Sequence, residues 1–195
     1  MFTGIIEAVG RITRVEPRDR GVRLTIASDK LDFSDVAIGD SIAANGVCLT
    51  VTALGGKAYT VDVSQETLSC TVGLDAPGEV NLEKAMRMSD RLGGHLVSGH
   101  VDGVGEVAKF EPVGESHLLQ IRAPRELARY IAAKGSMTVN GVSLTVNDIC
   151  DNVFSINLIP HTLEVTTLKH LKPGSRVNLE VDMLARYVDR LLHPE

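Results

Sequence analysis

The chain of 195 residues contains no tryptophan, and aromatic residues make up only 4% of it. A stacking platform for single-stranded nucleic acid is therefore not expected. An excess of basic residues is missing as well, because 20 lysines and arginines stand against 25 aspartates and glutamates and leave a net charge of −5. Nucleic-acid binding is not predicted for such a chain.

Long apolar runs and a cysteine framework are also missing. No stretch approaches the roughly 20 apolar residues that cross a bilayer, and the first residues lack the basic and apolar regions of a signal peptide. The cysteines Cys48, Cys70 and Cys150 are odd in number and widely spaced, so neither a disulfide framework nor a zinc site is predicted. We expect a cytoplasmic protein with no metal and no membrane partner.

The main feature that is present is an internal repeat. The run NGVCLTV at 45–51 recurs as NGVSLTV at 140–146, an offset of 95 positions. The same offset matches Gly4 with Gly99, and near the end of each copy it becomes 97, where VNLE recurs. Such a long shared register indicates two tandem copies of one small domain rather than a solenoid.

Each copy is predicted to consist mainly of β-strands. The segments 22–26, 49–53 and 59–63 alternate between apolar and polar residues, are rich in β-branched side chains and are separated by glycine-containing breaks. Short strands at this spacing are typical of a small barrel. Helices are expected after Pro124 up to Gly135, at the equivalent 30–38, at 65–71 and at 161–168.

The segment Met183–His193 is predicted to be an amphipathic helix. Its apolar stripe consists of Leu184, Tyr187, Val188, Leu191 and Leu192. Two explanations fit this stripe equally well: it packs on its own barrel, or it forms a seam between subunits.

Differences between the copies mark candidate functional residues. Cys48 is matched by Ser143, and each shares its strand face with a threonine, Thr50 or Thr145. A cysteine at such a place is ordinarily a small buried hydrophobe. The alternative is a residue that orients a ligand or assists a nucleophile.

Two ionisable residues break the symmetry of the repeat. His100 stands where the first copy has Ile5, and Asp182 stands where it has Ala85. From the sequence alone, a solvated strand end is the better explanation of Asp182, and a functional carboxylate is the alternative. His95, in the same glycine-rich run as His100, lacks the third ligand that a metal site requires. The run GVGEVA at 103–108 does not open a long helix, so it is not predicted to bind a dinucleotide. Two similar but unequal sites fit a reaction between two molecules of one substrate.

The sequence resembles the riboflavin synthase α-chain family over nearly its whole length. The resemblance lies in MFTGII at 1–6, the two repeated runs, GGHLVSGH at 93–100 and LIPHTL at 158–163. It implies a mainly β fold with two tandem, similar six-stranded Greek-key β-barrels plus a C-terminal α-helix. The implied divisions are 1–92 and 93–182 for the lumazine-binding barrels and 183–195 for the helix, through which the family forms homotrimers.

The resemblance also implies a reaction. Two molecules of 6,7-dimethyl-8-ribityllumazine dismutate, one giving a four-carbon unit to the other, to yield riboflavin and 5-amino-6-(D-ribitylamino)uracil. No cofactor and no metal take part. The family's site lies between the N-terminal barrel of one subunit and the C-terminal barrel of a neighbour, and association with lumazine synthase stays open.

Site residues follow from the same resemblance. Substrate contacts in the first copy are Gly4, Ile5, Ile6, Cys48, Leu49, Thr50, Asp62, Val63, Ser64, Gln65, Glu66 and Thr67. Those in the second copy are Gly99, His100, Val101, Lys134, Ser143, Leu144, Thr145, Asn157, Leu158, Ile159, Pro160, His161 and Thr162. The catalytic set is Ser41, Cys48, His100, Ser143, Thr145 and Asp182. The chain departs from the family at Ser64–Gln65, where Met-Lys is common, and at His161, where Glu is common, which leaves the binding strength open.

The implied chemistry needs a base for a 7-methyl proton and a nucleophile that adds at C7 of the partner molecule. Our hypothesis gives the first role to His100 with Thr145, and the second to Ser41, Cys48 or a water with Asp182 nearby. The rival interpretation is a non-catalytic lumazine- or flavin-binding antenna protein. Such proteins typically lose catalytic residues of the second barrel, which this chain retains.

Overall fold

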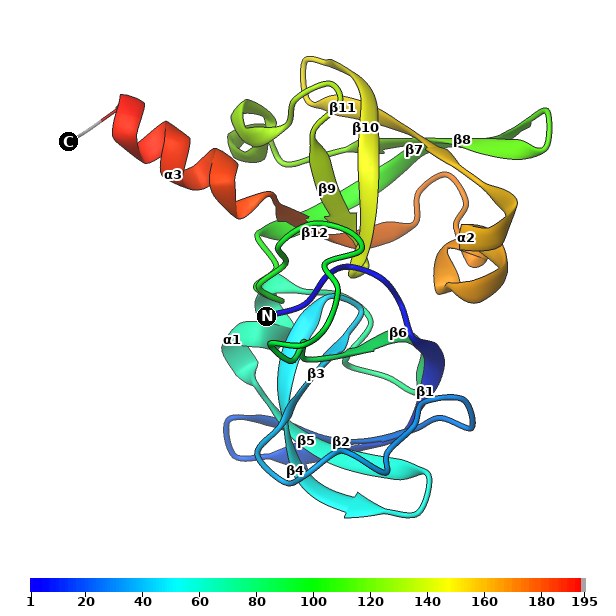
Figure 1. Ribbon diagram of the computed structural model, residues 1–195, viewed down its shortest axis with the longest axis vertical. Helices are drawn as coiled ribbons and strands as arrows, with labels where there is room; N and C mark the ends of the chain where they lie inside the picture. Colours follow the sequence, from blue (N-terminus) through cyan, green and yellow to red (C-terminus); the bar gives the residue numbers. More distant parts are fainter. Residues whose placement is uncertain (194–195) are drawn as a thin grey trace.

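The computed structural model describes residues 1–193 and contains two closed six-stranded antiparallel barrels (Figure 1). The first barrel comprises β1 (Ala8–Arg18), β2 (Gly21–Ala27), β3 (Ser41–Ala44), β4 (Val47–Gly55), β5 (Ala58–Ser64) and β6 (Gly78–Lys84). The second comprises β7 (Gly103–Val113), β8 (Ser116–Arg122), β9 (Ser136–Val139), β10 (Val142–Cys150), β11 (Val153–Leu158) and β12 (Arg176–Val181). The predicted mainly β, two-barrel fold is confirmed.

Both barrels have the same strand order. The first runs β1-β2-β5-β4-β3-β6, and the second, read around its ring, runs β7-β8-β11-β10-β9-β12. In each, three hairpin-connected strands are followed by a fourth that returns beside the first of them, which is the Greek-key connection. The internal repeat of the sequence is therefore a repeat of topology.

Each barrel closes around its own core. Leu24, Ile26 and Leu82 are fully buried in the first barrel, as are Leu119 and Ile121 in the second. Burying each such side chain contributes about 1.5–3 kcal/mol. Buried and exposed residues alternate along most of the strands. The side chains on the outer face of each of these strands can therefore contact a ligand or another part of the protein.

The repeated Asn-Gly pairs form the junction between the barrels. Asn45–Gly46 and Asn140–Gly141 are hairpin turns in which both residues have positive φ, 48° and 82° in each turn. The turns lie back to back, and a Cβ on Gly46 would be only 2.8 Å from the amide nitrogen of Gly141. Asn178 Nδ2 donates to the carbonyl of Asn45 (3.0 Å), so the turns are also joined by side chains.

The short predicted helices are found in three of the four places. α1 (Gln65–Cys70), α2 (Pro160–Val165) and the 3₁₀ helix η2 (Thr167–His170) confirm two of them, and the helix after Pro124 is a shorter 3₁₀ helix, η1 (Arg125–Tyr130). The helix predicted at 30–38 is wrong, since this segment consists of bends and turns. Asp32 accepts a hydrogen bond from the Ser34 amide and Asp40 from the Ala37 amide, both at 2.9 Å, and such local bonds compete with a helix.

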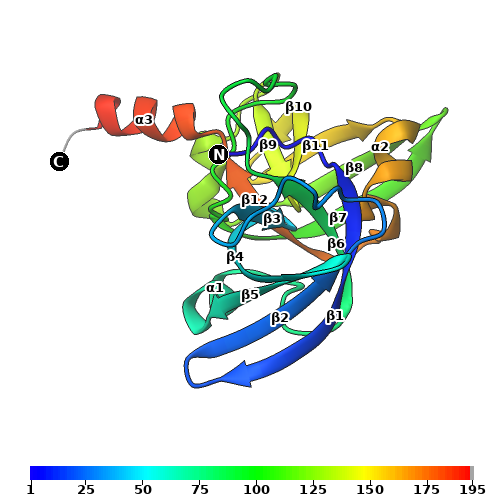
Figure 2. The ribbon, with the colours of Figure 1, turned by 60° about the horizontal axis from the view of Figure 1, so that its bottom comes forward.

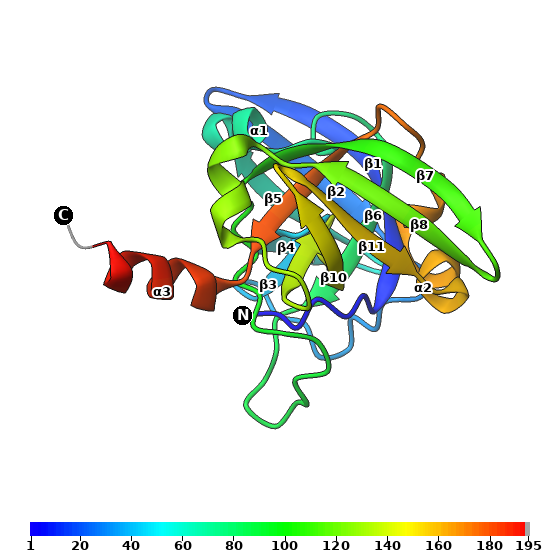
Figure 3. The same cartoon turned by 90° about the horizontal axis from the view of Figure 1, so that it is seen from above.

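The C-terminal helix α3 (Met183–Leu192) is present and projects away from both barrels (Figures 2 and 3). Its stripe is open to solvent, with Leu184 59%, Tyr187 66% and Leu191 80% exposed. The explanation in which this stripe packs on its own barrel is therefore wrong. Positions 194 and 195 of the predicted segment 183–195 lie outside the described residues. Over residues 1–193, no helix combines the length and apolarity needed to span a membrane.

Candidate functional site

In the first barrel, β4 and β5 separate before they reach the end of the barrel. Their ladder runs as far as Val51 and Val61. Beyond that point the amide of Cys48 donates instead to the carbonyl of Gly99 (2.8 Å). We call the opening beside β4 the first-barrel site; it is bordered by Cys48, Thr50, 62–67 and 99–101.

The second barrel has the same opening between β10 and β11. The ladder ends at Val146 and Ile156, and the amide of Ser143 donates to the carbonyl of Gly4 (2.8 Å). We call this the second-barrel site; it is bordered by Ser143, Thr145, 157–162, 4–6 and Lys134. Separated strand edges present backbone donors and acceptors, which suit a flat ring with amide-like edges.

The segments that precede each barrel cross to the other barrel. Gly4 contacts Ser143, and Ile6 packs against the second core. Gly99 contacts Cys48, and Val101 packs against the first core. The sequence register grouped 4–6 with the first copy and 99–101 with the second, and the structure reverses this grouping. A register aligns positions along the chain and does not show which barrel a segment lies against.

Two buried glutamates hold the crossing segments. Glu83 accepts hydrogen bonds from the Thr3 amide (2.6 Å), the Thr3 hydroxyl (2.7 Å) and the Gly4 amide (3.0 Å). Glu180 does the same for the Ser98 amide (2.7 Å), the Ser98 hydroxyl (2.6 Å) and the Gly99 amide (3.0 Å). Burial raises the pKa of both carboxyls, against the hydrogen bonds that lower it. The repeated VNLE run was the available sequence signal, because it places a glutamate in an apolar strand.

Strand alternation divides the predicted contact residues into two kinds. Cys48, Thr50, Asp62, Ser143, Thr145 and Asn157 lie on the outer faces of their strands. Leu49, Val63, Leu144 and Leu158 point into the barrel cores. The second kind can reach a ligand in the opening only through backbone atoms.

The borders of the two sites differ in detail. In the first, Arg23 Nε and Nη2 each donate to Asp62 at 2.7 Å and hold the pKa of its carboxyl below the usual range. Ser64 Oγ accepts from the Thr67 amide and caps α1, which begins with Gln65 and Glu66. In the second, α2 follows Ile159 without a side-chain cap and begins with Pro160, His161 and Thr162.

Lys134 occupies a strained backbone position. Its φ is +68°. The equivalent residue of the first copy, Gly39, has a φ of +98°, which glycine adopts without strain because it has no Cβ. The left-handed region costs a residue with a side chain about 1–2 kcal/mol. The surrounding structure holds this conformation, in part through the Lys134 amide, which donates to the carbonyl of Val146 (2.8 Å).

The six predicted catalytic residues fall into two groups. Ser41 pairs with Thr50, and His100 directly follows Gly99, so both belong with Cys48 to the first barrel. Thr145 lies with Ser143 on β10. Asp182 directly precedes α3 and caps it, since its carboxylate accepts from the Leu184 amide (2.9 Å). Our hypothesis paired His100 with Thr145, and Ser41 or Cys48 with Asp182. Each of these pairs is divided between the two barrels.

One residue outside the predicted set contacts the second-barrel site. His95 Nδ1 lies 2.7 Å from Ser143 Oγ. Burial lowers the pKa of His95, while the nearby Asp182 carboxylate raises it by a smaller amount. Its place in the glycine-rich run GGHLVSGH was the only sequence signal, and that run did not distinguish His95 from His100.

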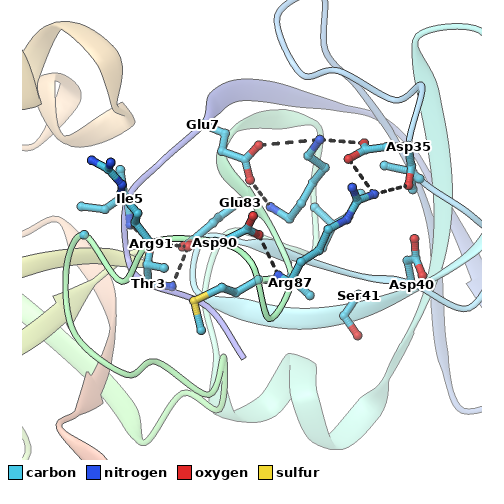
Figure 4. A pocket seen from close by; sticks show the side chains of 16 residues that line it. Thr3, Ile5, Glu7, Asp35, Asp40, Ser41, Glu83, Arg87, Asp90 and Arg91 are labelled. Carbon is cyan, nitrogen blue, oxygen red and sulfur yellow. Dashed lines mark hydrogen bonds and ion pairs between the residues drawn. The ribbon is translucent and has the colours of Figure 1, made fainter.

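A cavity of about 620 Å³ with both charged and apolar lining residues lies between β3, the linker after β6 and the N-terminal segment (Figure 4). Ser41 lines it at one side, and Ile5 and Gly93 line it as well. Its charged side chains pair with one another: Lys84 lies 2.8 Å and Arg87 2.9 Å from Asp35. The cavity therefore borders the first-barrel site through Ser41. Within residues 1–193, no cluster of three or more His, Cys, Asp or Glu side chains is placed to hold a metal ion.

The fold and these two openings define a duplicated barrel protein with one candidate small-molecule site on each barrel. The family model "Lumazine binding domain" matches residues 3–85 and 98–182, and the chain belongs to this family. It is 50% identical over 194 residues to "Riboflavin synthase" of Photobacterium phosphoreum, covering 98% of this chain and 89% of that one. It is 43% identical over 195 residues to "Riboflavin synthase" of Bacillus subtilis (strain 168), covering 99% and 90%.

Solved structures of similar fold are complexes of LumP. The complex with 6,7-dimethyl-8-(1'-D-ribityl) lumazine has a TM-score of 0.81 at 27% identity, over 93% of this chain and 99% of that one. The complex with riboflavin has a TM-score of 0.82 at 28% identity, over the same shares, 93% and 99%.

Proposed function

We propose that the chain is an enzyme, a riboflavin synthase. It converts two molecules of 6,7-dimethyl-8-ribityllumazine into riboflavin and 5-amino-6-(D-ribitylamino)uracil by transfer of a four-carbon unit. The carrying observation is that relatives 43–50% identical over nearly the whole chain bear this name. The two related but unequal openings fit this reaction, because its two substrates are the same molecule in two roles.

The reaction needs one lumazine to lose a 7-methyl proton and the other to be attacked. The proton is acidic because the resulting carbanion delocalises into the ring, so a positioned base suffices. We assign proton transfer to His100 with Thr145, and the addition at C7 to Ser41, Cys48 or an activated water with Asp182 nearby. Ser143 completes the catalytic set. Holding two substrates in register supplies up to about 7–11 kcal/mol in ideal cases.

The division of each catalytic pair between barrels supports a site shared by two chains. The first-barrel face of one chain and the second-barrel face of a neighbour together supply His100 with Thr145, and Cys48 with Asp182. The solvent-open stripe of α3 gives such chains a seam. We therefore propose a cytoplasmic homotrimer joined through α3, with association with lumazine synthase as a further proposal that co-sedimentation tests.

The functional divisions are part of the same proposal. Residues 1–92 and 93–182 are the two lumazine-binding barrels, and 183–195 is the oligomerisation segment. Because the crossing segments exchange places, each barrel depends on the other for one border of its site. We expect neither division to form a complete site alone.

The experiment that tests the function uses the purified protein and 6,7-dimethyl-8-ribityllumazine in EDTA, with nothing else added. Riboflavin and the ribitylaminouracil should appear in equal amounts, with two lumazines consumed for each pair. Chromatography and absorbance follow all three compounds. A requirement for any added cofactor would contradict the proposal.

A second candidate is a lumazine-binding protein without turnover. The observation that favours it is the fold similarity to LumP bound to the lumazine and to riboflavin. The same experiment separates the two functions, since tight lumazine binding without products would assign the chain to the non-catalytic class.

A further inference from the structure

His95 lies in the linker between the barrels and is held against the second-barrel site by its own backbone. The amide of His95 donates to the carbonyl of Thr3 (3.1 Å), in the segment that Glu83 anchors. The preceding Gly94 lets the linker approach closely, because a Cβ there would be 2.9 Å from the Ser143 Cβ and 2.1 Å from the Thr3 carbonyl oxygen. The backbone contacts of Gly94 and His95 with Thr3 and Ser143 thus fix the position of the imidazole.

The two ring nitrogens of His95 have different surroundings. Nδ1 lies 2.7 Å from Ser143 Oγ. Nε2 is buried and has no hydrogen-bond partner among the described residues. A buried polar atom without a partner is unfavourable, so stability alone does not account for a histidine at this place. The contact with the Ser143 hydroxyl is the remaining use of the ring.

We infer that His95 is a positioning residue of the second-barrel site, whose neutral imidazole accepts the Ser143 hydroxyl hydrogen at Nδ1 and turns the Oγ lone pairs toward the bound pteridine. The inference rests on the proposed function, because it assigns a role in that substrate site. Asp182 is the charged group that acts on the ring, and burial opposes protonation. In the first-barrel site Cys48 takes the place of Ser143, and no described residue sets an imidazole on its sulfur. The oriented oxygen therefore distinguishes the lumazine of the second barrel from that of the first.

The kinetic test compares His95→Ala, His95→Asn, Ser143→Ala and the double variant His95→Ala/Ser143→Ala in the full chain. His95→Ala should lower kcat about tenfold, as expected for one lost hydrogen bond, and change the Kd for 6,7-dimethyl-8-ribityllumazine less than threefold. His95→Asn should recover part of kcat, because its Oδ1 can take the place of Nδ1. The double variant should be as slow as Ser143→Ala alone, since the two residues act as a unit.

Two kinetic outcomes would overturn the inference. One is a double variant whose loss is the product of the two single losses. The other is a His95→Ala variant that binds lumazine weakly with kcat unchanged, which is the behaviour of a wall residue. His170→Asn is the matched control, because His170 is exposed and contacts Glu79 away from both sites, and it should keep full activity.

A readout that does not depend on turnover separates this inference from the proposed function. Nitrogen-15 NMR of the His95 ring should show an unprotonated Nδ1 in the wild type, and its signal should move in Ser143→Ala and on addition of the lumazine. A wild type that makes no riboflavin overturns the proposed function and leaves this test intact. A protonated Nδ1, or a signal that ignores Ser143→Ala, overturns the role of His95.

Discussion

Glu83 and Glu180 support the two sites indirectly, because they bind the crossing segments and not the strands that border the openings. Each fixes a crossing segment by three hydrogen bonds, and each crossing segment supplies the carbonyl that binds Ser143 or Cys48. Carboxylates buried in apolar strands are costly unless they are fully paired. Here both oxygens of each carboxylate accept hydrogen bonds, and these bonds attach the crossing segments to the barrels.

Replacing Glu83 by Gln should lower the free energy of unfolding by about 1–3 kcal/mol, because the new NH₂ group cannot accept and leaves a buried donor of Thr3 or Gly4 unpaired. Urea unfolding measures the change. Glu79→Gln on the same strand is the control, since Glu79 is exposed and should change stability by less than about 0.5 kcal/mol. Equal effects of the two substitutions would contradict the anchoring role.

The raised pKa values of Glu83 and Glu180 predict a pH dependence. A folded-state pKa above the ordinary 4.5 means that the folded chain holds these protons more tightly than the unfolded chain does. The resulting stability is present below pH 4.5 and is lost as pH rises through the raised values. The difference in unfolding free energy between the wild type and Glu83→Gln/Glu180→Gln should therefore be larger at pH 5 than at pH 8. The same difference in unfolding free energy at both pH values would contradict this prediction.

His100→Ala and Asp182→Ala should each lower kcat more than they weaken lumazine binding. A residue that moves a proton in the transition state contributes about 10²–10⁴-fold, whereas a residue that only binds substrate changes KM. Steady-state kinetics and fluorescence titration of the lumazine give the two quantities. Equal losses in both would assign these residues to binding.

At the scale of elements, the two Asn-Gly turns are the most constrained part of the fold. They must adopt positive φ and also touch each other across the junction. Gly46→Ala should destabilise the chain by more than Gly56→Ala, which changes a turn with similar φ (+60°) but no atom within 4 Å of the new Cβ. Gly56→Ala should cost about 1–2 kcal/mol. Thermal unfolding of the two variants provides the comparison, and equal losses would show that the junction contact is dispensable.

Much of this architecture could be predicted from the sequence. Alternation along β4 and β10 assigns Cys48 and Ser143 to outer faces, and the repeated register predicts equal barrels. The helix at 30–38 failed because Asp32 and Asp40 bind nearby amides, which helix periodicity does not reveal. The exchange of Gly4 and Gly99 between barrels could not be predicted, since it depends on how the two barrels dock. The role of His95 could not be predicted either, because only the fold brings Ser143 next to it.

At the scale of the whole molecule, α3 carries a solvent-open apolar stripe away from both barrels. It is tied to the second barrel by the ion pairs Arg129–Asp189 and Arg186–Asp102. Neither pair covers the stripe. The helix is thus held in direction by charge while its apolar face is left for another chain.

Deleting residues 183–195 should dissociate the oligomer and abolish turnover, while the barrels stay folded and bind lumazine. Leu184→Glu/Leu191→Glu in the full chain should have the same effect, since charges on the seam oppose burial. Analytical ultracentrifugation, circular dichroism and the activity assay measure the three properties. A monomer with full activity would rule out a site shared between chains.

The contact of Gly4 with Ser143 has a consequence for how the chain assembles. Residues 5–142 lie between these two residues. Closing that loop loses entropy before the contact stabilises anything, and pairings so distant along the chain slow folding. During synthesis, Thr3 to Ile6 leave the ribosome long before β10 exists. The second-barrel site is therefore completed last, although one of its borders is made of the residues that are synthesised first.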